Sequence, residues 1–192
     1  KEFFHVVPGA PHPSALEQDI LEYREEILQL GSTLLGWIQN NAPLEIRTGF
    51  SEPLSTVLCP TASLLRVLHY PPLSGEETAG AVRAAPHEDI NLITILPVSH
   101  QPGLQVKTLR GEWLNLETST GELIVNIGDM LEKASDGYFP STTHQVINPV
   151  DAEENISRIS IPFFLTPHLE FVLSDSYTAG SYLDERLKLL NR

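Results

Sequence analysis

Two histidines and one aspartate have the types and the spacing of a metal site. His87 and Asp89 are separated by a single residue, and His144 comes much later in the chain. On an extended backbone, residues two apart project to the same side, so His87 and Asp89 are predicted to share a ligand while Glu88 points away. A jelly roll would place His144 opposite this pair. Two histidines and one carboxylate on one face of a metal leave other positions open, as non-haem iron(II) sites require for a cosubstrate and dioxygen.

The His-x-Asp spacing alone does not decide between several kinds of site. It is also typical of surface pairs and of histidines at strand ends. Catalytic zinc uses a similar set of ligands and keeps an open position, so a hydrolytic zinc site is an alternative.

Arg158 and Ser160 form a second motif. They open the most apolar segment of the chain, residues 159–165, and lie on one side of the predicted strand. A guanidinium in an apolar β core is costly unless it meets an anion, and its fork of donors beside a hydroxyl matches a carboxylate. We predict that the pair binds a dicarboxylate cosubstrate, which favours the iron site over the zinc site. The alternative is an internal ion pair with an aspartate or glutamate.

Helices are predicted on both sides of the region that carries these motifs. Apolar residues at helical spacing predict a long amphipathic helix over residues 14–39 and a last helix over 182–190. Residues 40–60 contain several prolines and are predicted as a connection, with a helical turn at 54–58.

Short apolar runs between turn residues predict an all-β core. These runs are residues 64–70, 92–96, 104–109, 113–116, 123–126, 145–147 and 159–165. Arg110 and Gly111 predict a tight hairpin turn, and residues 71–86 and 129–143 are predicted as long loops. The fold class is mainly β with flanking helices, in the form of a sandwich, barrel or jelly roll.

The charge and the cysteine count limit the partners. The chain has 12 lysines and arginines against 25 aspartates and glutamates, which gives a net charge of -13. Nucleic acid and anionic membrane surfaces would be repelled, so neither is expected as a partner. Cys59 is the one cysteine, and no apolar stretch reaches the length of a membrane span, so a cytoplasmic location is expected.

These motifs together resemble the isopenicillin N synthase-like family of iron(II)- and 2-oxoglutarate-dependent dioxygenases. His-x-Asp, a distant His and Arg-x-Ser occur there in the same order, and the resemblance extends through Leu-Arg-Val-Leu-His-Tyr-Pro at 65–71, Gly-Leu-Gln-Val at 103–106 and Asn-Ile-Gly-Asp at 126–129. The resemblance implies a double-stranded β-helix (jelly roll, cupin-like) core. It also implies iron on His87, Asp89 and His144, and 2-oxoglutarate held by Arg158, Ser160 and Tyr70.

The resemblance further implies an activity. The protein is expected to hydroxylate or desaturate a small-molecule substrate with Fe(2+), 2-oxoglutarate and O2, to release succinate and CO2, and to use ascorbate as a reductant. Four residues near the motifs are candidates for the substrate lining, namely Arg83, Asn91, Tyr138 and Phe164. The alternatives are an isopenicillin N synthase-like oxidase that works without 2-oxoglutarate and a non-catalytic cupin-like module that binds metal or a small acid.

The chain is expected to divide into two regions. Residues 1–61 are predicted as a helical support region, whose N-terminal remainder is expected to be missing from this chain. Residues 62–192 are predicted as the dioxygenase jelly-roll domain with its C-terminal helix. We expect the jelly-roll core to lose stability without the missing region, because a sheet face or edge would be exposed.

Overall fold

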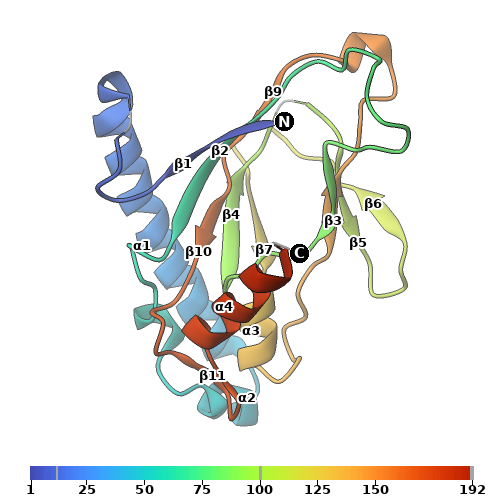
Figure 1. The fold of residues 1–192 in the computed structure, drawn as a ribbon. Helices are drawn as coiled ribbons and strands as arrows, with labels where there is room; N and C mark the ends of the chain where they lie inside the picture. Colours follow the sequence, from blue (N-terminus) through green and yellow to red (C-terminus); the bar gives the residue numbers. More distant parts are fainter. Residues whose placement is uncertain (12, 100, 191–192) are drawn as a thin grey trace.

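Short strands dominate the chain after residue 63, and the described residues form two larger antiparallel sheets and one small two-stranded sheet (Figure 1). The computed structural model describes residues 1–11, 13–99 and 101–190. The main sheet has the order β1-β2-β10-β4-β7, with β9 paired to β2, and the second sheet has the order β3-β8-β5-β6. The main sheet consists of β1 (Glu2–Val6), β2 (Leu64–Tyr70), β4 (Ile93–Pro97), β7 (Leu123–Ile127), β9 (Arg158–Ser160) and β10 (Phe163–Leu165). The second sheet consists of β3 (Ala84–His87), β5 (Leu104–Lys107), β6 (Trp113–Asn115) and β8 (His144–Val146).

The long helix α1 (Glu17–Asn41) follows a 3-10 turn, η1 (Ser14–Leu16), and lies along the main sheet (Figure 1). Its apolar residues recur at helical spacing, and this places Ile27 and Leu35 in the buried core. Gly31 lies so close to β10 that an added Cβ would overlap the side chain of Leu165. The helix predicted over residues 14–39 is confirmed.

Alternation along the central strands separates the core from the inner face of the jelly roll. In β4, Ile93 and Ile95 are fully buried in the core that includes α1, whereas Thr94 and Leu96 line a cavity between the sheets. In β10, Phe163 and Leu165 belong to the core, and Phe164 lines the cavity. In these parts of β4 and β10, successive residues thus face either the hydrophobic core or the cavity, because side chains alternate between the two faces of a strand.

Smaller elements complete the fold. Helix α3 (Asp129–Ala134) and helix α4 (Ala179–Leu190) lie close together in Figure 1, and Arg186 of α4 pairs with Asp129 of α3. The remaining elements are α2 (Leu44–Gly49), η2 (Leu54–Thr56), α3 (Asp129–Ala134), η3 (Ala152–Glu154), β11 (Val172–Ser174), β12 (Tyr177–Thr178) and α4 (Ala179–Leu190). The mainly β fold with flanking helices is as predicted, and no pairing among the described residues closes the two sheets into a barrel. No helix in the described chain combines the length and the apolarity needed to cross a membrane.

One expectation about an individual strand was wrong. Residues 159–165 form two strands, β9 and β10, because Pro162 lacks the N–H that a continuous ladder needs. Its carbonyl instead accepts a bond from the backbone N–H of Arg66. The first residues of the predicted helical support region form β1, which pairs with β2 from Glu2 to Val6 and adds an edge strand to the main sheet.

His87 and Asp89 do not lie on one strand, which corrects a further expectation. His87 ends β3 in the second sheet, and Asp89 lies in the segment that crosses to β4 in the main sheet. The predicted loops at 71–86 and 129–143 also contain regular structure, namely the start of β3 and helix α3. The turn at Arg110 and Gly111 does join β5 to β6, with Gly111 at a φ of 85°.

Candidate metal centre

The two histidines face each other across one strand pair. His87 of β3 and His144 of β8 are directly opposite in the antiparallel register, and their ring centroids lie 4.3 Å apart. The Nδ1 of His87 lies 2.8 Å from the carbonyl oxygen of Ala85, and the Nδ1 of His144 lies 2.9 Å from that of Thr142. A carbonyl only accepts hydrogen bonds, so Nδ1 carries the proton in both rings. In the neutral form of each ring, Nε2 therefore carries no proton, and its lone pair can bind a metal.

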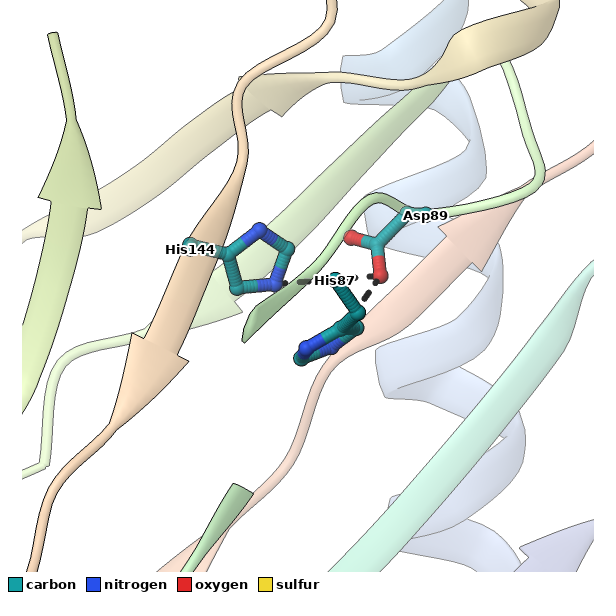
Figure 2. Close-up of side chains that lie close together, drawn as sticks. All are labelled: His87, Asp89 and His144. Atoms are coloured by element: carbon teal, nitrogen blue, oxygen red, sulfur yellow. Dashed lines mark ion pairs between the residues drawn. The ribbon is translucent and has the colours of Figure 1, made fainter. Parts of the chain in front are cut away.

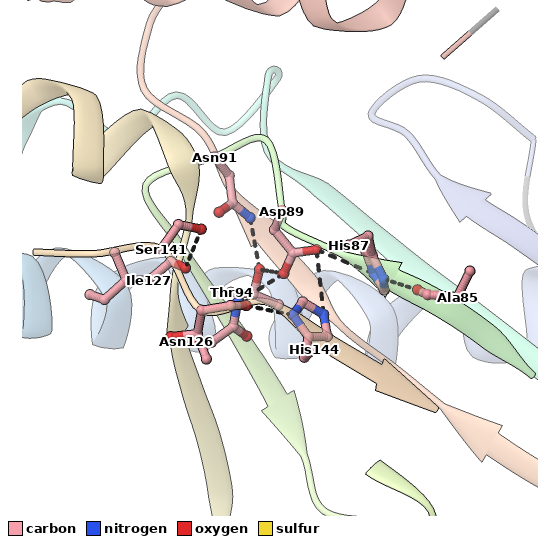
Figure 3. Close-up of polar contacts among 10 residues, drawn as sticks. Ala85, His87, Asp89, Asn91, Thr94, Asn126, Ile127, Ser141 and His144 are labelled. Carbon is pink, nitrogen blue, oxygen red and sulfur yellow. Dashed lines mark hydrogen bonds and ion pairs between the residues drawn. The ribbon is translucent and has the colours of Figure 1, made fainter. Parts of the chain in front are cut away.

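Asp89 completes the group with a buried carboxylate (Figure 2). Its Oδ1 lies 3.9 Å from the Nε2 of His87 and 3.8 Å from the Nε2 of His144. Its Oδ2 accepts bonds from the Oγ1 of Thr94 at 2.6 Å and from the Nδ2 of Asn126 at 3.0 Å (Figure 3). The two oxygens thus have different surroundings, and Oδ1 is the one turned toward the imidazoles.

The Oδ1 of Asp89 is too far from the Nε2 atoms of the two histidines to hydrogen-bond to either, and the spacing of these three atoms suits one shared cation better. One ligand atom from each residue lies within 4.8 Å of the others. Metal–ligand distances of about 2.0–2.2 Å place neighbouring ligands roughly 3–3.5 Å apart, somewhat less than the 3.9 and 3.8 Å from the Asp89 Oδ1 to the two imidazoles. Partial burial lowers the pKa of His87, and the electrostatic effect of the neighbouring His144 lowers it further. The lowered pKa favours the neutral, metal-binding form of the ring.

The segment that carries Asp89 is held by the start of α3. The backbone N–H of Asp129 donates to the carbonyl of Asp89 at 2.9 Å, and that of Met130 donates to the carbonyl of Asn91 at 3.1 Å. Gly128 packs so closely on Asn91 that an added Cβ would overlap both its side chain and its backbone. The Asn-Ile-Gly-Asp motif at 126–129 therefore supports the metal centre from behind.

The same cavity contains the second motif. A cavity of about 90 Å³ is lined by His87, Asp89, His144, Tyr70, Arg158 and Ser160, together with apolar residues of both sheets. Strand β9 pairs with β2 so that Arg158 stands opposite Tyr70 and Ser160 stands opposite Leu68. The structure thus brings together the five residues of the two motifs and Tyr70.

Arg158 is buried and lacks a carboxylate partner. It is 3% exposed, and its Nη1 donates to the backbone carbonyls of Gln101 and Pro102. Its Nε has no acceptor, and no ion pair joins it to an aspartate or glutamate of the described chain. Burial lowers the pKa of this guanidinium from its ordinary value. Among the described residues, the internal ion pair of the alternative is not found, and the buried Nε of Arg158 is free to donate a hydrogen bond.

The substrate candidates are only partly near the metal centre. Phe164 lines the cavity. Among the described residues, the cavity lining does not include Arg83, Asn91 or Tyr138. Arg83 is buried and donates to the carbonyl of Ile156, Asn91 donates to Thr94 behind the carboxylate, and Tyr138 is 47% exposed. These three lie close to the motifs in sequence, but all three lie outside the strands, in connecting segments whose side chains do not line the cavity.

Three functional residues were missed from the sequence. Thr94 and Asn126 hold the Asp89 carboxylate, and Arg66 lines the cavity. Thr94 and Asn126 are Cα partners in the pairing of β4 with β7, a relation between segments that spacing does not reveal. Arg66 was detectable, because it lies four residues before Tyr70 on a predicted strand and so shares its face.

Comparisons with known proteins agree with this geometry. The family model of the 2OG-Fe(II) oxygenase superfamily matches residues 61–167. Gibberellin 2-beta-dioxygenase 7 of Arabidopsis thaliana is 39% identical over 109 residues, which cover 56% of this chain and 30% of that protein. The 2-oxoglutarate-dependent dioxygenase citB of Monascus ruber is 30% identical over 172 residues, which cover 86% of this chain and 49% of that protein. The crystal structure of a proposed oxygenase from Shewanella oneidensis is 53% identical with a TM-score of 0.90, over 98% of this chain and 70% of that one.

The chain belongs to the 2OG-Fe(II) oxygenase superfamily, because the family model matches more than half of it. This confirms the predicted superfamily of iron(II)- and 2-oxoglutarate-dependent dioxygenases and its jelly-roll fold. The chain spans 30% and 49% of the lengths of the two curated relatives above.

Proposed function

We propose that the protein containing this chain is a non-haem iron(II)- and 2-oxoglutarate-dependent dioxygenase that oxidises a small molecule. The observation that carries the proposal is one cavity with two contrasting halves. One half presents two Nε2 atoms and one carboxylate oxygen, and the other presents a buried guanidinium without an anion. A metal and a dicarboxylate satisfy both halves, whereas either ligand alone leaves one half unsatisfied.

In this proposal His87, Asp89 and His144 hold the iron on one face. Their supports fix both the tautomers and the carboxylate orientation, so the three atoms that would hold the metal face the cavity. Iron with 2-oxoglutarate and dioxygen supplies the oxidising chemistry when bound, with succinate and carbon dioxide as products.

The second half of the cavity orients the cosubstrate. Arg158 donates to the far carboxylate of 2-oxoglutarate, and the hydroxyl of Ser160 adds a donor from the same face of β9. Tyr70, opposite Arg158 on β2, closes this side. Apolar residues around them limit water and strengthen the charged contacts.

Calorimetric titration of 2-oxoglutarate into the anaerobic iron(II) protein tests the proposal. Wild type is expected to bind one 2-oxoglutarate. Arg158→Gln is expected to raise the dissociation constant of 2-oxoglutarate by roughly tens of fold or more, because a buried charge pair is lost. Iron affinity is expected to stay unchanged in the variant. Equally tight 2-oxoglutarate binding in Arg158→Gln would refute the role of this residue.

The titration and an assay of succinate formation together separate the alternatives. An oxidase that takes all four electrons from its substrate would not bind 2-oxoglutarate in the wild type. A cupin-like binding module would bind metal and acid but form no succinate with any substrate tested. Substrate-dependent succinate formation is the result that only the proposed function predicts.

The partners and the location are part of the proposal. The net charge of -13 supports a small-molecule substrate over nucleic acid, since phosphates would be repelled. Cys59 is the single cysteine and is free, which supports a reducing compartment such as the cytoplasm. The division at residue 61 and the isopenicillin N synthase-like branch of the superfamily also belong to the proposal, supported by the order of the motifs.

A further inference from the structure

Arg66 is a second arginine on the wall of the metal-centre cavity. It lies on β2 together with Leu68 and Tyr70, and all three line the cavity because they alternate with Val67 and His69. The lining also includes Asp89, and the charge of that carboxylate acts on Arg66. Arg66 therefore belongs to the inner face of the jelly roll.

The Arg66 guanidinium is held in place by neutral groups. Its Nε donates to the Nε2 of His5 on β1 at 2.8 Å. Its central carbon lies 5.5 Å from the ring centre of Phe3 and 5.2 Å from that of Phe164. These contacts orient the guanidinium without neutralising it, because an imidazole acceptor and two aromatic rings carry no formal negative charge.

No carboxylate of the described chain pairs with Arg66. Its one hydrogen bond is the bond to His5, so both Nη groups lack a protein acceptor. Asp89 is the single carboxylate among the residues that line the cavity, and its Oδ2 is already bound by Thr94 and Asn126. An uncompensated arginine inside a cavity is unusual in a chain with 25 acidic residues.

When the other charges of the cavity are balanced, the positive charge of Arg66 remains. The two positive charges of iron(II) and that of Arg158, reduced by the charge of Asp89, balance a 2-oxoglutarate dianion. Arg66 remains as one positive charge on the inner face of the cavity. A substrate without an acceptor would leave Arg66 unpaired, and a neutral acceptor would not offset its charge, whereas a carboxylate does both.

We propose that Arg66 binds a carboxylate of the substrate, and that the substrates are small monocarboxylic acids with an apolar body. This inference rests on the proposed function, since it assigns the substrate class of the same site. The apolar body fits the rest of the lining, in which Leu68 stands beside Arg66 on β2 and Phe164 covers the guanidinium. The two Nη groups supply the paired donors that a carboxylate accepts.

Equilibrium binding to the anaerobic iron(II) protein with saturating 2-oxoglutarate tests the inference. The probes are phenylacetate, benzoate and hexanoate, each measured by calorimetry beside its primary amide. In wild type, at least one acid is expected to bind about tenfold or more tightly than its amide, because a charge-assisted bidentate pair replaces a neutral contact. Arg66→Gln is expected to reduce this preference to about twofold or less.

A matched variant controls for net charge. Lys107→Gln removes one positive charge from an exposed residue of β5 and is expected to keep the full acid preference. The 2-oxoglutarate affinity of Arg66→Gln is expected to stay within about twofold of wild type. Failure of wild type to bind 2-oxoglutarate would count against the proposed function, and not against the role of Arg66.

Two results would overturn the role of Arg66. The first is that no acid binds wild type more tightly than its amide, a comparison that needs no variant and holds even where Arg66→Gln fails to fold. The second is an unchanged acid preference in Arg66→Gln with a lower melting temperature, which would mean that Arg66 only stabilises the β1–β2 edge through His5 and Phe3.

Discussion

At the scale of single residues, the metal centre is defined by the atoms that already have partners. The Nδ1 atoms of His87 and His144 are used by backbone carbonyls, and the Oδ2 of Asp89 is used by Thr94 and Asn126. The remaining donor atoms converge on one point. The supports therefore matter as much as the ligands, because they decide which atom faces the cavity.

Thr94→Val tests this dependence on supporting bonds. Valine keeps the shape but removes both the donor to Asp89 and the acceptor of Asn91. We expect the affinity for iron(II) or zinc to fall by about 10- to 100-fold, as measured by competition with a chelator. Thr118→Val, at an exposed site after β6, serves as the control. Unchanged metal affinity in Thr94→Val would mean that Asp89 is oriented by other groups.

At the scale of elements, the segment between β3 and β4 depends on the start of α3. Three consecutive backbone N–H groups, of Gly128, Asp129 and Met130, donate to carbonyls of residues 89–92. The opening of a helix has free N–H groups, and here they bind the segment that carries Asp89. The motif at 126–129 thus couples the position of the α3 N-terminus to the position of the segment that carries Asp89.

Gly128→Ala is expected to disturb this link. The added methyl group would overlap Asn91, so the segment of Asp89 must move. We expect a loss of roughly 2 kcal/mol or more in the free energy of unfolding, together with weaker metal binding. Gly49→Ala is the control, since a Cβ there meets no atom within 4 Å. Equal metal affinity in the two variants would contradict the expectation.

Asp129 connects α3 to α4 and is expected to make stability depend on pH. Burial raises its pKa to about 6, although Arg186 and the hydroxyl of Tyr182 act in the opposite direction. The folded protein then holds a proton that the unfolded chain releases near pH 4. The contribution of Asp129 to stability is full below pH 4 and falls as the pH rises to about 6.

Asp129→Asn should remove this fall in stability. In denaturant unfolding of the metal-free protein, the free energy of unfolding of the variant is expected to rise relative to that of wild type between pH 4 and pH 6. The gain is at most about 3 kcal/mol, reduced by solvent in the hollow beside Asp129. Asp136→Asn, an exposed neighbour, should show no such trend. A constant difference across this pH range would rule out the raised pKa.

At the scale of the whole molecule, a metal would connect the two sheets. His87 and His144 belong to the second sheet, and Asp89 lies on the segment that enters the main sheet. We expect a metal at 100 times its dissociation constant to raise stability by about 2.7 kcal/mol, or roughly 5–10 °C in melting temperature. Asp89→Ala should lose this increase, with one metal bound per chain in wild type. An equal increase in the variant would place the metal elsewhere.

The candidate ligand types, the second motif and most strands could be predicted from the sequence alone. His87, Asp89, His144, Arg158 and Ser160 were proposed because few residue types suit this chemistry, and the structure places all five around one cavity. Strands β2, β4 and β7 were identified because short apolar runs between turns have few other structures. The helix α1 was predictable for the same reason, from its apolar period.

Only the tertiary structure decided how these residues meet. It placed His87 and Asp89 on different elements, paired Thr94 with Asn126 across two strands and left Arg66 and Arg158 without carboxylates. Such relations depend on which strands become neighbours, and this is set by packing between segments far apart in the chain. Local periodicity determines the face on which a side chain lies, whereas long-range pairing determines what that face meets.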